Sequence, residues 1–158
     1  MTQEEKDLLL QDLCARLPYG VFCNMGLDYP LPLQRLFVDK LDGILLDFYE
    51  DGKAYQVYLS EVKPYLRPMS SMTKEERVEF SQLLDKRYCE EDWEGHISTS
   101  YCIEIDDVYI DDEGGIKYPS TFRMDAVDWL NAHHFDYRGL IEKGLAIEVT
   151  KENNPYEN

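Results

Sequence analysis

Hydrophobic residues near the start of the chain recur at helical spacing, three or four positions apart. They are Leu9, Leu10, Leu13 and Leu17. Pro18 ends the pattern, because proline cannot continue a helix. Thr2 followed by Glu5 is a capping-box sequence, in which each side chain accepts a hydrogen bond from the backbone amide of the other residue. The pattern predicts a helix from about Gln3 to Arg16.

Shorter hydrophobic runs follow, with the alternation that is typical of half-buried strands. The runs are Tyr19–Cys23, Gly43–Tyr49, Ala54–Leu59 and Val62–Leu66. Asp51 and Gly52 lie between the second and third runs and predict a tight hairpin turn, which requires positive φ angles. Several short strands in about 50 residues predict a small barrel of the SH3 or Tudor kind, an analogy of fold that carries no function.

The second half of the chain begins after a linker-like stretch, Arg67–Met72. Thr73 and Glu76 form another capping box, and the helix that they open has an apolar stripe. A second apolar helical face follows Pro119. The two sets are Phe80, Leu83 and Leu84, and then Phe122, Ala126, Trp129, Leu130 and His133. The end of the chain predicts a short helix over Tyr137–Lys143, a strand over Leu145–Val149, and a tail from Lys151 to Asn158 that has little to pack and frays.

Between these two helices the pattern alternates again. Tyr101, Ile103 and Ile105 share one side of a predicted strand, and Cys102, Glu104 and Asp106 share the other. A turn over 111–115 leads into a return strand at 116–118, which predicts an antiparallel hairpin sheet. The fold class is therefore α+β, with a helix and small barrel in residues 1–68 and an α+β unit in residues 69–158. Whether the two parts share one continuous core is open.

Composition supports a folded protein without membrane spans. Hydrophobic residues make up 44% of the 158 positions, and no apolar run approaches the roughly 18 residues that a membrane helix needs. The first residues lack the basic and then apolar pattern of a secretory signal, so we expect a cytoplasmic protein. The four cysteines form no CxxC pair and no Cys/His zinc pattern, and we expect them to be reduced and mostly buried.

Negative charge is concentrated in one segment. From Tyr88 to Ile116 the sequence has ten acidic residues and no Lys or Arg, whereas the other 129 residues have 22 acids and 16 bases. This acidic segment holds ten of the sixteen net negative charges. Repulsion from phosphates argues against nucleic acid or an anionic membrane as the direct partner. A basic protein surface or a cation fits the charge better.

Three stretches carry a resemblance to a group of proteins. LLLQDLCARLPYGV, VKPYLRPMSSMTKEE and LNAHHFDYRGLIEKGLAIE resemble phrases in small uncharacterised proteins of gut anaerobes, their phages and their mobile elements. The stretches cover under half of the chain. No activity is attached to these proteins, so no functional residue is carried over. The resemblance implies an accessory gene of a phage or mobile element.

The acidic segment is the candidate binding site, although a solvated face that only keeps the protein soluble is the more common reason for such a charge run. Alternate strand carboxylates lie about 6.6 to 7 Å apart, where each pair repels by about 0.6 kcal/mol in water. A basic partner would relieve this repulsion. The candidate partner-binding residues are Glu90, Glu91, Asp92 and Glu94, then Glu104, Asp106 and Asp107, then Asp111, Asp112 and Glu113, with Trp93 and Tyr109 as apolar anchors.

Catalytic and metal chemistry have weaker support. The EF-hand order fails, because counting from Asp107 places Asp112 where the loop requires glycine, so at most a weak calcium site is expected. His133 and His134 are adjacent and point about 100° apart on a helix, so they do not form a ligand pair. We expect His133 to pack, His134 to be exposed and Asp136 to cap the next helix. His96 is a weak catalytic hint, since no recognisable nucleophile accompanies it. No catalytic residue, metal or cofactor is predicted.

Three functions from different classes remain. The first is a non-enzymatic, acidic binding protein that docks on a basic protein surface, such as a nucleic-acid-handling enzyme or a host defence nuclease, and inhibits it in an anti-CRISPR-like manner by mimicking nucleic acid. The second is an interaction module that binds through the barrel-like half, where Tyr29, Leu31 and Leu33 of the proline-rich loop 26–33 are exposed anchors unless the loop simply packs. The third is an unrecognised enzyme with a pocket at His96 or His134.

Overall fold

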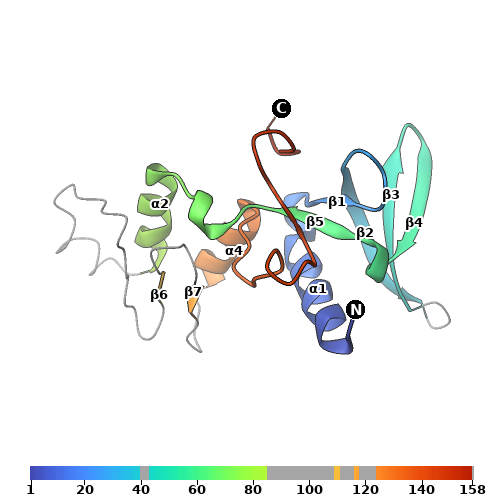
Figure 1. The fold of residues 1–158 in the computed structure, drawn as a ribbon, viewed down its shortest axis with the longest axis horizontal. Coiled ribbons are helices and arrows are strands. Elements are labelled where there is room, and N and C mark those ends of the chain that lie inside the picture. The colour runs from blue at the N-terminus through green and yellow to red at the C-terminus, as the bar shows by residue number, and fades with distance from the viewer. Residues whose placement is uncertain (40–42, 85–108, 111–115, 118–123, 158) are drawn as a thin grey trace. The chain divides into compact units, whose positions relative to one another are not determined.

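The computed structural model describes residues 1–39, 43–84, 109–110, 116–117 and 124–157, and the chain forms two compact units. The first unit comprises Met1–Arg67 and Arg138–Asn158, and the second comprises Pro68–Tyr137. The fold is α+β: an N-terminal helix, a six-stranded mixed sheet that curls into a half-barrel, and short helices (Figure 1). The C-terminal residues therefore belong to the same unit as the N-terminal helix.

Helix α1 spans Gln3–Arg16, as predicted. Both hydrogen bonds of its capping box are present: the Thr2 amide donates to the Glu5 carboxylate at 2.6 Å, and the Glu5 amide donates to the Thr2 hydroxyl at 3.2 Å. A short 3-10 turn, η1, continues the chain over Leu17–Tyr19 and ends at Gly20, whose φ is +73°. The local signals at both ends of α1 therefore fixed its length.

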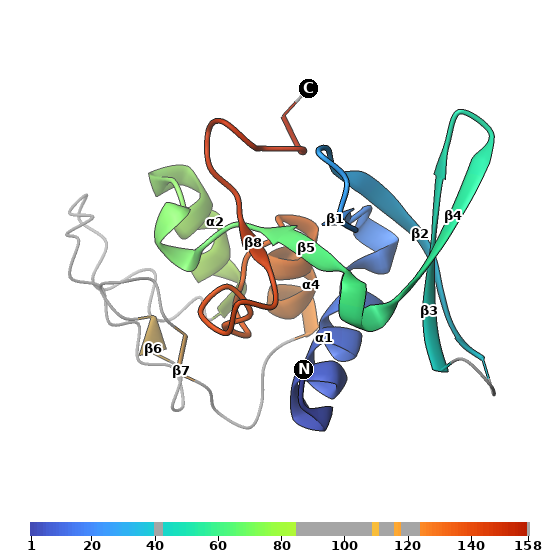
Figure 2. The ribbon, with the colours of Figure 1, turned by 45° about the vertical axis from the view of Figure 1, so that its right-hand side comes forward.

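The sheet has the strand order β4-β3-β2-β1-β5-β8. Its strands are β1 (Phe22–Asn24), β2 (Leu31–Asp39), β3 (Gly43–Glu50), β4 (Lys53–Tyr58), β5 (Lys63–Leu66) and β8 (Ile147–Glu148). Neighbouring strands are antiparallel except for β5 and β8, which run parallel. Figure 2 shows β8 beside β5, so the end of the chain completes a sheet that the first third begins. A 3-10 turn, η2 (Leu59–Glu61), joins β4 to β5.

The predicted β3–β4 hairpin is confirmed. The two strands pair from Glu50 and Lys53 at the turn to Leu45 and Tyr58 at the far end. Asp51 and Gly52 between them have φ values of +47° and +78°, the positive angles that the turn requires.

Strand β2 was not predicted, although it is the longest strand in the sheet. Its first residues belong to the proline-rich loop 26–33, for which packing against the barrel and exposed anchors were both considered. Leu31 and Leu33 are buried, at 6% and 3% exposure, so packing is confirmed for both, whereas Tyr29 is exposed. Pro32 is tolerated because the pairing of β2 with β3 begins only at Leu33, after the residue that lacks an N–H.

The core of the first unit lies between α1 and the sheet. Leu9 and Leu13 of α1 are fully buried and pack with side chains from the strands. The strand contributions are Cys23, Leu31, Leu33, Leu46, Phe48 and Leu66, and Val21 packs with them directly before β1. Cys23 is buried as expected, but Cys14 is exposed, so the expectation of buried cysteines fails there.

An ion-pair cluster is buried at the same helix. The Asp12 carboxylate accepts from Arg16 at 2.8 and 3.0 Å and from Arg138 at 2.9 Å, and the side chains of Asp12 and Arg16 are both fully buried. Arg138 reaches Asp12 from the C-terminal part of the unit. The cluster therefore ties the end of the chain to α1.

The C-terminal segment differs from the prediction in two respects. Turns replace the helix that was expected over Tyr137–Lys143, with positive φ at Gly139 and Gly144, and the strand is only the two residues of β8. The tail does not fray at Tyr156, whose ring packs edge-on against Phe22 with centroids 5.5 Å apart. The sequence offered no periodic signal for this single anchoring aromatic residue.

The second unit contains helices α2 (Lys74–Leu84) and α4 (Met124–Ala132), preceded by the 3-10 turn η3 (Met69–Ser71). The predicted capping box of α2 is present, with the Thr73 amide donating to Glu76 at 2.8 Å and the Glu76 amide donating to Thr73 at 3.1 Å. The core of this unit lies between the helices and the residues that follow α4. It comprises Met69, Met72, Phe80, Ala126, Trp129, Leu130, Phe135 and Tyr137.

Two further strands of the second unit, β6 (Tyr109–Ile110) and β7 (Ile116–Lys117), pair antiparallel over two residues each. The longer strand predicted around residues 101–106 lies outside the described residues. The separate hairpin sheet of the second half therefore stays a prediction.

Candidate functional site

The sequence-predicted binding residues fall almost entirely outside the described part of the chain. Only Tyr109 is included, as the first residue of β6. The others that lie outside are Glu90, Glu91, Asp92, Trp93, Glu94, Glu104, Asp106, Asp107, Asp111, Asp112 and Glu113. His96, the weak catalytic hint, also lies outside. The structure therefore neither brings these residues together nor separates them.

The described residues do contain a candidate site, on the outer face of β2, β3 and β4. Strand register places two rows of side chains across these three strands. One row is Arg35, Asp47 and Gln56, and the next is Phe37, Leu45 and Tyr58. Because alternate residues of a strand share a face, both rows lie on the side opposite the core residues Leu46 and Phe48.

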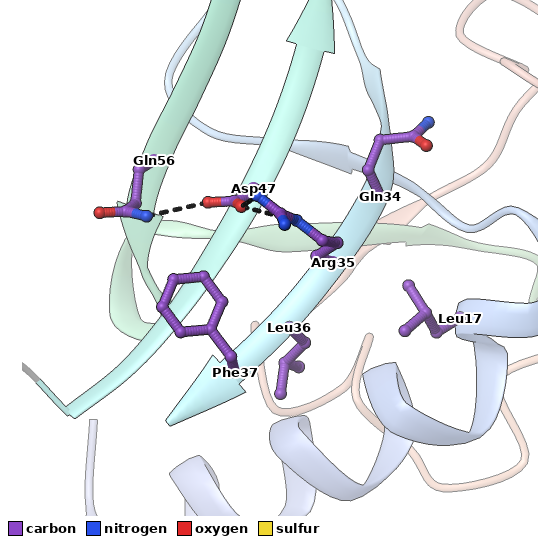
Figure 3. A pocket seen from close by; sticks show the side chains of 7 residues that line it. All are labelled: Leu17, Gln34, Arg35, Leu36, Phe37, Asp47 and Gln56. Carbon is purple, nitrogen blue, oxygen red and sulfur yellow. Dashed lines mark hydrogen bonds and ion pairs between the residues drawn. The ribbon is translucent and has the colours of Figure 1, made fainter. Parts of the chain in front are cut away.

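The polar row is joined by hydrogen bonds. The Arg35 guanidinium donates to one Asp47 carboxylate oxygen at 2.6 and 3.0 Å, and the Gln56 amide donates to the other at 3.0 Å (Figure 3). Arg35 also donates to the Tyr49 hydroxyl at 2.8 Å. The Asp47 side chain is 5% exposed and that of Arg35 is 64% exposed, so the buried carboxylate holds the guanidinium at the surface.

Hydrogen bonds also raise the pKa of two side chains on this part of the sheet. The Asp47 carboxylate beside Arg35, together with Tyr49, raises the pKa of the Arg35 guanidinium. The Tyr29 hydroxyl donates to the Glu50 carboxylate at 2.7 Å, and this bond raises the pKa of Tyr29 to about 12. Both hydrogen bonds therefore favour the protonated form of the group that donates them.

The apolar row has exposed aromatic side chains at both ends. Phe37 is 37% exposed, Tyr58 is 47% exposed, and Leu45 between them is covered to 6%. Tyr49, one row beyond the ion pair, is 43% exposed. These rings give the outer face flat apolar surfaces that stand beside a fixed ion pair.

An open pocket of about 380 Å³ lies next to the rows. It is lined by Leu17, Gln34, Arg35, Leu36, Phe37, Asp47 and Gln56 (Figure 3). Leu17 comes from η1 and the other residues come from the three strands. The pocket thus joins the end of α1 to the outer face, in an arrangement suited to binding a partner group against Phe37 and the ion pair.

The histidines that the sequence singled out form part of the second unit. His133 packs as predicted: its ring stacks on Trp129 with centroids 3.9 Å apart, and its Nδ1 lies 2.9 Å from the Trp129 carbonyl oxygen. His134 is 7% exposed with a φ of +58°, so the prediction that it is exposed is wrong. Turns follow α4, so the helix that Asp136 was expected to cap is not present, and Asp136 is buried.

Sequence reasoning missed the outer face because it missed β2. A register shift between Leu33 and Arg35 moves the inward-facing positions from the odd residues to the even residue Leu36, which is partly buried. This bulge interrupts the alternation that marks a strand. The available signal was the apolar run Leu36-Phe37-Val38, whose aromatic and β-branched residues are typical of strands.

Within residues 1–39, 43–84 and 124–157, and the two short strands between them, no three His, Cys, Asp or Glu side chains cluster closely enough to hold a metal ion. No helix in the same described part of the chain is long and apolar enough to cross a membrane.

Comparisons with protein-family models, with curated proteins and with solved structures find no match to this chain.

Proposed function

We propose that this protein is a non-enzymatic binding protein whose acidic segment, Tyr88–Ile116, docks on a basic protein surface. The observation that carries the proposal is the charge distribution: ten acidic residues and no Lys or Arg within that segment. Crowded carboxylates repel one another, and a basic partner relieves that repulsion. Association with such a partner is also accelerated by long-range attraction.

The class of partner follows from the density of charge. A groove that binds a nucleic-acid backbone is lined with basic residues, and a run of carboxylates presents a similar negative charge to it. We therefore propose a nucleic-acid-handling enzyme, such as a host defence nuclease, inhibited by occupation of its substrate groove. The resemblance to proteins of phages and mobile elements supports an accessory, anti-defence role of this kind.

Three groups of carboxylates would make the contacts, with aromatic anchors between them. They are Glu90, Glu91, Asp92 and Glu94, then Glu104, Asp106 and Asp107, then Asp111, Asp112 and Glu113, with Trp93 and Tyr109 as the anchors. The mechanism is steric and electrostatic, so it requires no catalytic residue and no cofactor.

The test is affinity capture from bacterial lysate with two variants of equal net charge. In the first, six residues of the acidic segment are changed to Asn or Gln: Glu104, Asp106, Asp107, Asp111, Asp112 and Glu113. In the control, six exposed acids elsewhere are changed in the same way: Glu4, Asp28, Glu75, Glu79, Glu142 and Glu157. We expect a nucleic-acid-binding protein to be captured by the wild type and the control and lost with the first variant.

A second measurement tests the mimicry. If the acidic segment occupies a nucleic-acid groove, DNA or RNA and this protein compete for the purified target, and the binding weakens as salt increases. Equal loss with both variants would contradict the proposal, because net charge alone would then explain capture. Simultaneous binding of nucleic acid and this protein to the target would contradict the mimicry.

A second candidate function is a protein-interaction module that binds through the half-barrel, in the manner of SH3 or Tudor folds. The specific observation in its favour is the exposed outer face of β2–β4, where Phe37, Tyr49 and Tyr58 stand beside the Arg35–Asp47 ion pair. If this face is the binding surface, changing the acidic residues between 104 and 113 to Lys leaves partner binding intact.

A further inference from the structure

The edge of the sheet at β4 is open to a further strand between Lys53 and Val57, whereas the Tyr58 amide already donates to the Glu61 carboxylate at 3.0 Å. β4 is the terminal strand of the sheet, and no described strand pairs with its other side (Figure 1). Its six pairs with β3 run without a register shift, and its sequence, KAYQVY, contains no proline and only one charge, at Lys53. Proteins ordinarily protect an edge with bulges, prolines, charges or short strands. The opposite edge follows that rule, since β8 has only two residues.

On the outer face beside this edge, one row of side chains leaves space for a side chain of an added strand. Ala54 lies on β4 directly opposite Tyr49 of β3, and both side chains are exposed. A strand added to β4 would lie about 9.6 Å from β3, with only the Ala54 methyl group between its side chain and the Tyr49 ring. Arg35, on the far side of β3, already places its guanidinium 5.9 Å from the Tyr49 ring centre. A cation of an added strand would therefore approach the Tyr49 ring from the β4 side, away from the Arg35 guanidinium.

Adjacent positions of β4 define what the added strand must carry. Tyr58, two rows away on the outer face, is 47% exposed and offers a further ring. On the inner face, Tyr55 and Val57 are only half-buried although they pack against the core. Apolar side chains of an added strand would cover them. The matching strand thus alternates cationic residues on one face with apolar residues on the other.

Charge favours the same partner. Between Asp28 and Glu61 the sequence has seven acidic residues and three basic ones, and two of the acids, Glu50 and Asp51, lie at the turn next to Ala54. Resting on the second candidate function, we propose that β4 binds an extended basic segment of another protein, which adds to the sheet as a strand. Its Lys or Arg side chains lie over Tyr49 and Tyr58, and its apolar side chains lie over Tyr55 and Val57.

Two other occupants fit less well. A second copy of this chain would add its own β4, whose outer residues Ala54, Gln56 and Tyr58 include no cation, and both copies carry a net charge of −16. The acidic segment of the same chain has no Lys or Arg and would add carboxylates to an acidic edge. A basic segment fits the net negative charge of residues 28–61 better than either of these occupants.

The test uses synthetic eight-residue peptides of alternating Val and Lys, or of alternating Val and Glu, with the full-length protein. We expect the Val-Lys peptide to bind, to slow hydrogen exchange of β4 backbone amides, and to lose at least about tenfold in affinity when its backbone is N-methylated at alternate residues. The Val-Glu peptide is expected not to bind.

Substitutions at Ala54 separate the charge effect from loss of fold. Ala54→Lys should weaken binding of the Val-Lys peptide by about fivefold, and Ala54→Glu should strengthen it by a similar factor, because exposed charges contribute modestly. If the substitutions instead damaged the fold, both Ala54→Lys and Ala54→Glu would weaken binding of the Val-Lys peptide. Gln11→Lys, at an exposed position of α1, changes the net charge as Ala54→Lys does and should leave the affinity unchanged.

The acidic-segment variant with six neutralised residues distinguishes this inference from the main proposal. Retained binding and β4 protection in that variant support strand addition at β4, whatever the outcome of lysate capture. Loss of binding in that variant would overturn the inference, because the peptide would then be bound by the acidic segment. Three other results would also overturn the inference. The first is binding of the Val-Lys peptide without slower hydrogen exchange in β4, and the second is no binding of the peptide at all. The third is slow exchange in β4 without any peptide, together with a dimeric mass, because a second copy of the chain would then cover the edge.

Discussion

The hydroxyl of Tyr156 donates a hydrogen bond to the carbonyl oxygen of Tyr65 at 2.7 Å, across 91 positions of the sequence. The same hydroxyl accepts from the Phe22 backbone amide at 3.3 Å. One side chain near the end of the chain thus satisfies backbone groups of both β5 and β1. It also packs edge-on against the Phe22 ring. Tyr156 therefore helps to hold the C-terminal tail to the sheet, together with the Asn153 amide, which donates to the Glu148 carbonyl oxygen of β8 at 3.0 Å.

Tyr156→Phe should lower the free energy of unfolding by about 1 to 2 kcal/mol, because it removes both hydrogen bonds and keeps the ring. Urea denaturation followed by circular dichroism measures the change. Tyr29→Phe is the matched control: its hydroxyl bonds to Glu50 at the surface, where water replaces the lost bond, so the loss should be much smaller than in Tyr156→Phe. Equal effects in the two variants would show that Tyr156 does not anchor the tail.

Asp12→Ala should be far more disruptive, lowering the free energy of unfolding by about 3 to 5 kcal/mol. It leaves the fully buried Arg16 guanidinium without this carboxylate and detaches Arg138 from α1. Asp7→Ala, at an exposed position of the same helix, should cost less than about 1 kcal/mol. Thermal unfolding of both variants checks the difference, and similar midpoints would contradict the role of the buried cluster.

The sequence predicted the elements whose signals are local. The Thr2–Glu5 capping box gave α1 its first residue, and Asp51-Gly52 gave the turn between β3 and β4. Strand β2 was missed because the bulge after Leu33 breaks its alternation, and the candidate face that β2 helps to form was missed with it. Two groups brought together by distant pairing, such as Arg138 and Asp12, leave no periodic pattern to read.

The β3–β4 turn makes a further prediction at Gly52. Its φ is +78°, and a Cβ there would meet nothing within 4 Å, so Gly52→Ala should cost about 1 to 2 kcal/mol from backbone strain alone. Asp51→Asn should change stability by less than about 0.5 kcal/mol, because asparagine tolerates the left-handed region. Chemical denaturation compares the two. Unchanged stability in Gly52→Ala would mean that the turn relaxes to another geometry.

The two described cysteines should differ in reactivity. Cys14 is exposed on α1, whereas Cys23 is fully buried in the core, and burial together with the nearby Asp12 charge raises the pKa of its thiol. Thiolate is the reactive form, so iodoacetamide at pH 8 should modify Cys14 in the folded protein and Cys23 only after denaturation. Peptide mapping by mass spectrometry separates these sites from the other cysteines. Early modification of Cys23 would contradict its burial.

Stability should fall at alkaline pH through the same buried thiol. Burial raises the pKa of Cys23, and burial likewise raises the pKa of Tyr156, so both groups keep their protons in the folded chain at pH values where the unfolded chain releases them. Their contribution is therefore complete below about pH 9 and is lost as pH increases above it, by at most about 1.4 kcal/mol per pH unit for each group.

Urea denaturation between pH 7 and 11 measures this slope, and the cysteine variants assign it. Cys23→Ala should reduce the decline between about pH 9 and 10, because tyrosine in the unfolded chain ionises only near pH 10. Cys14→Ala removes an exposed thiol and should leave the decline unchanged. An identical slope in the wild type and in Cys23→Ala would show that the folded chain releases the Cys23 proton as readily as the unfolded chain does, which its complete burial beside Asp12 argues against.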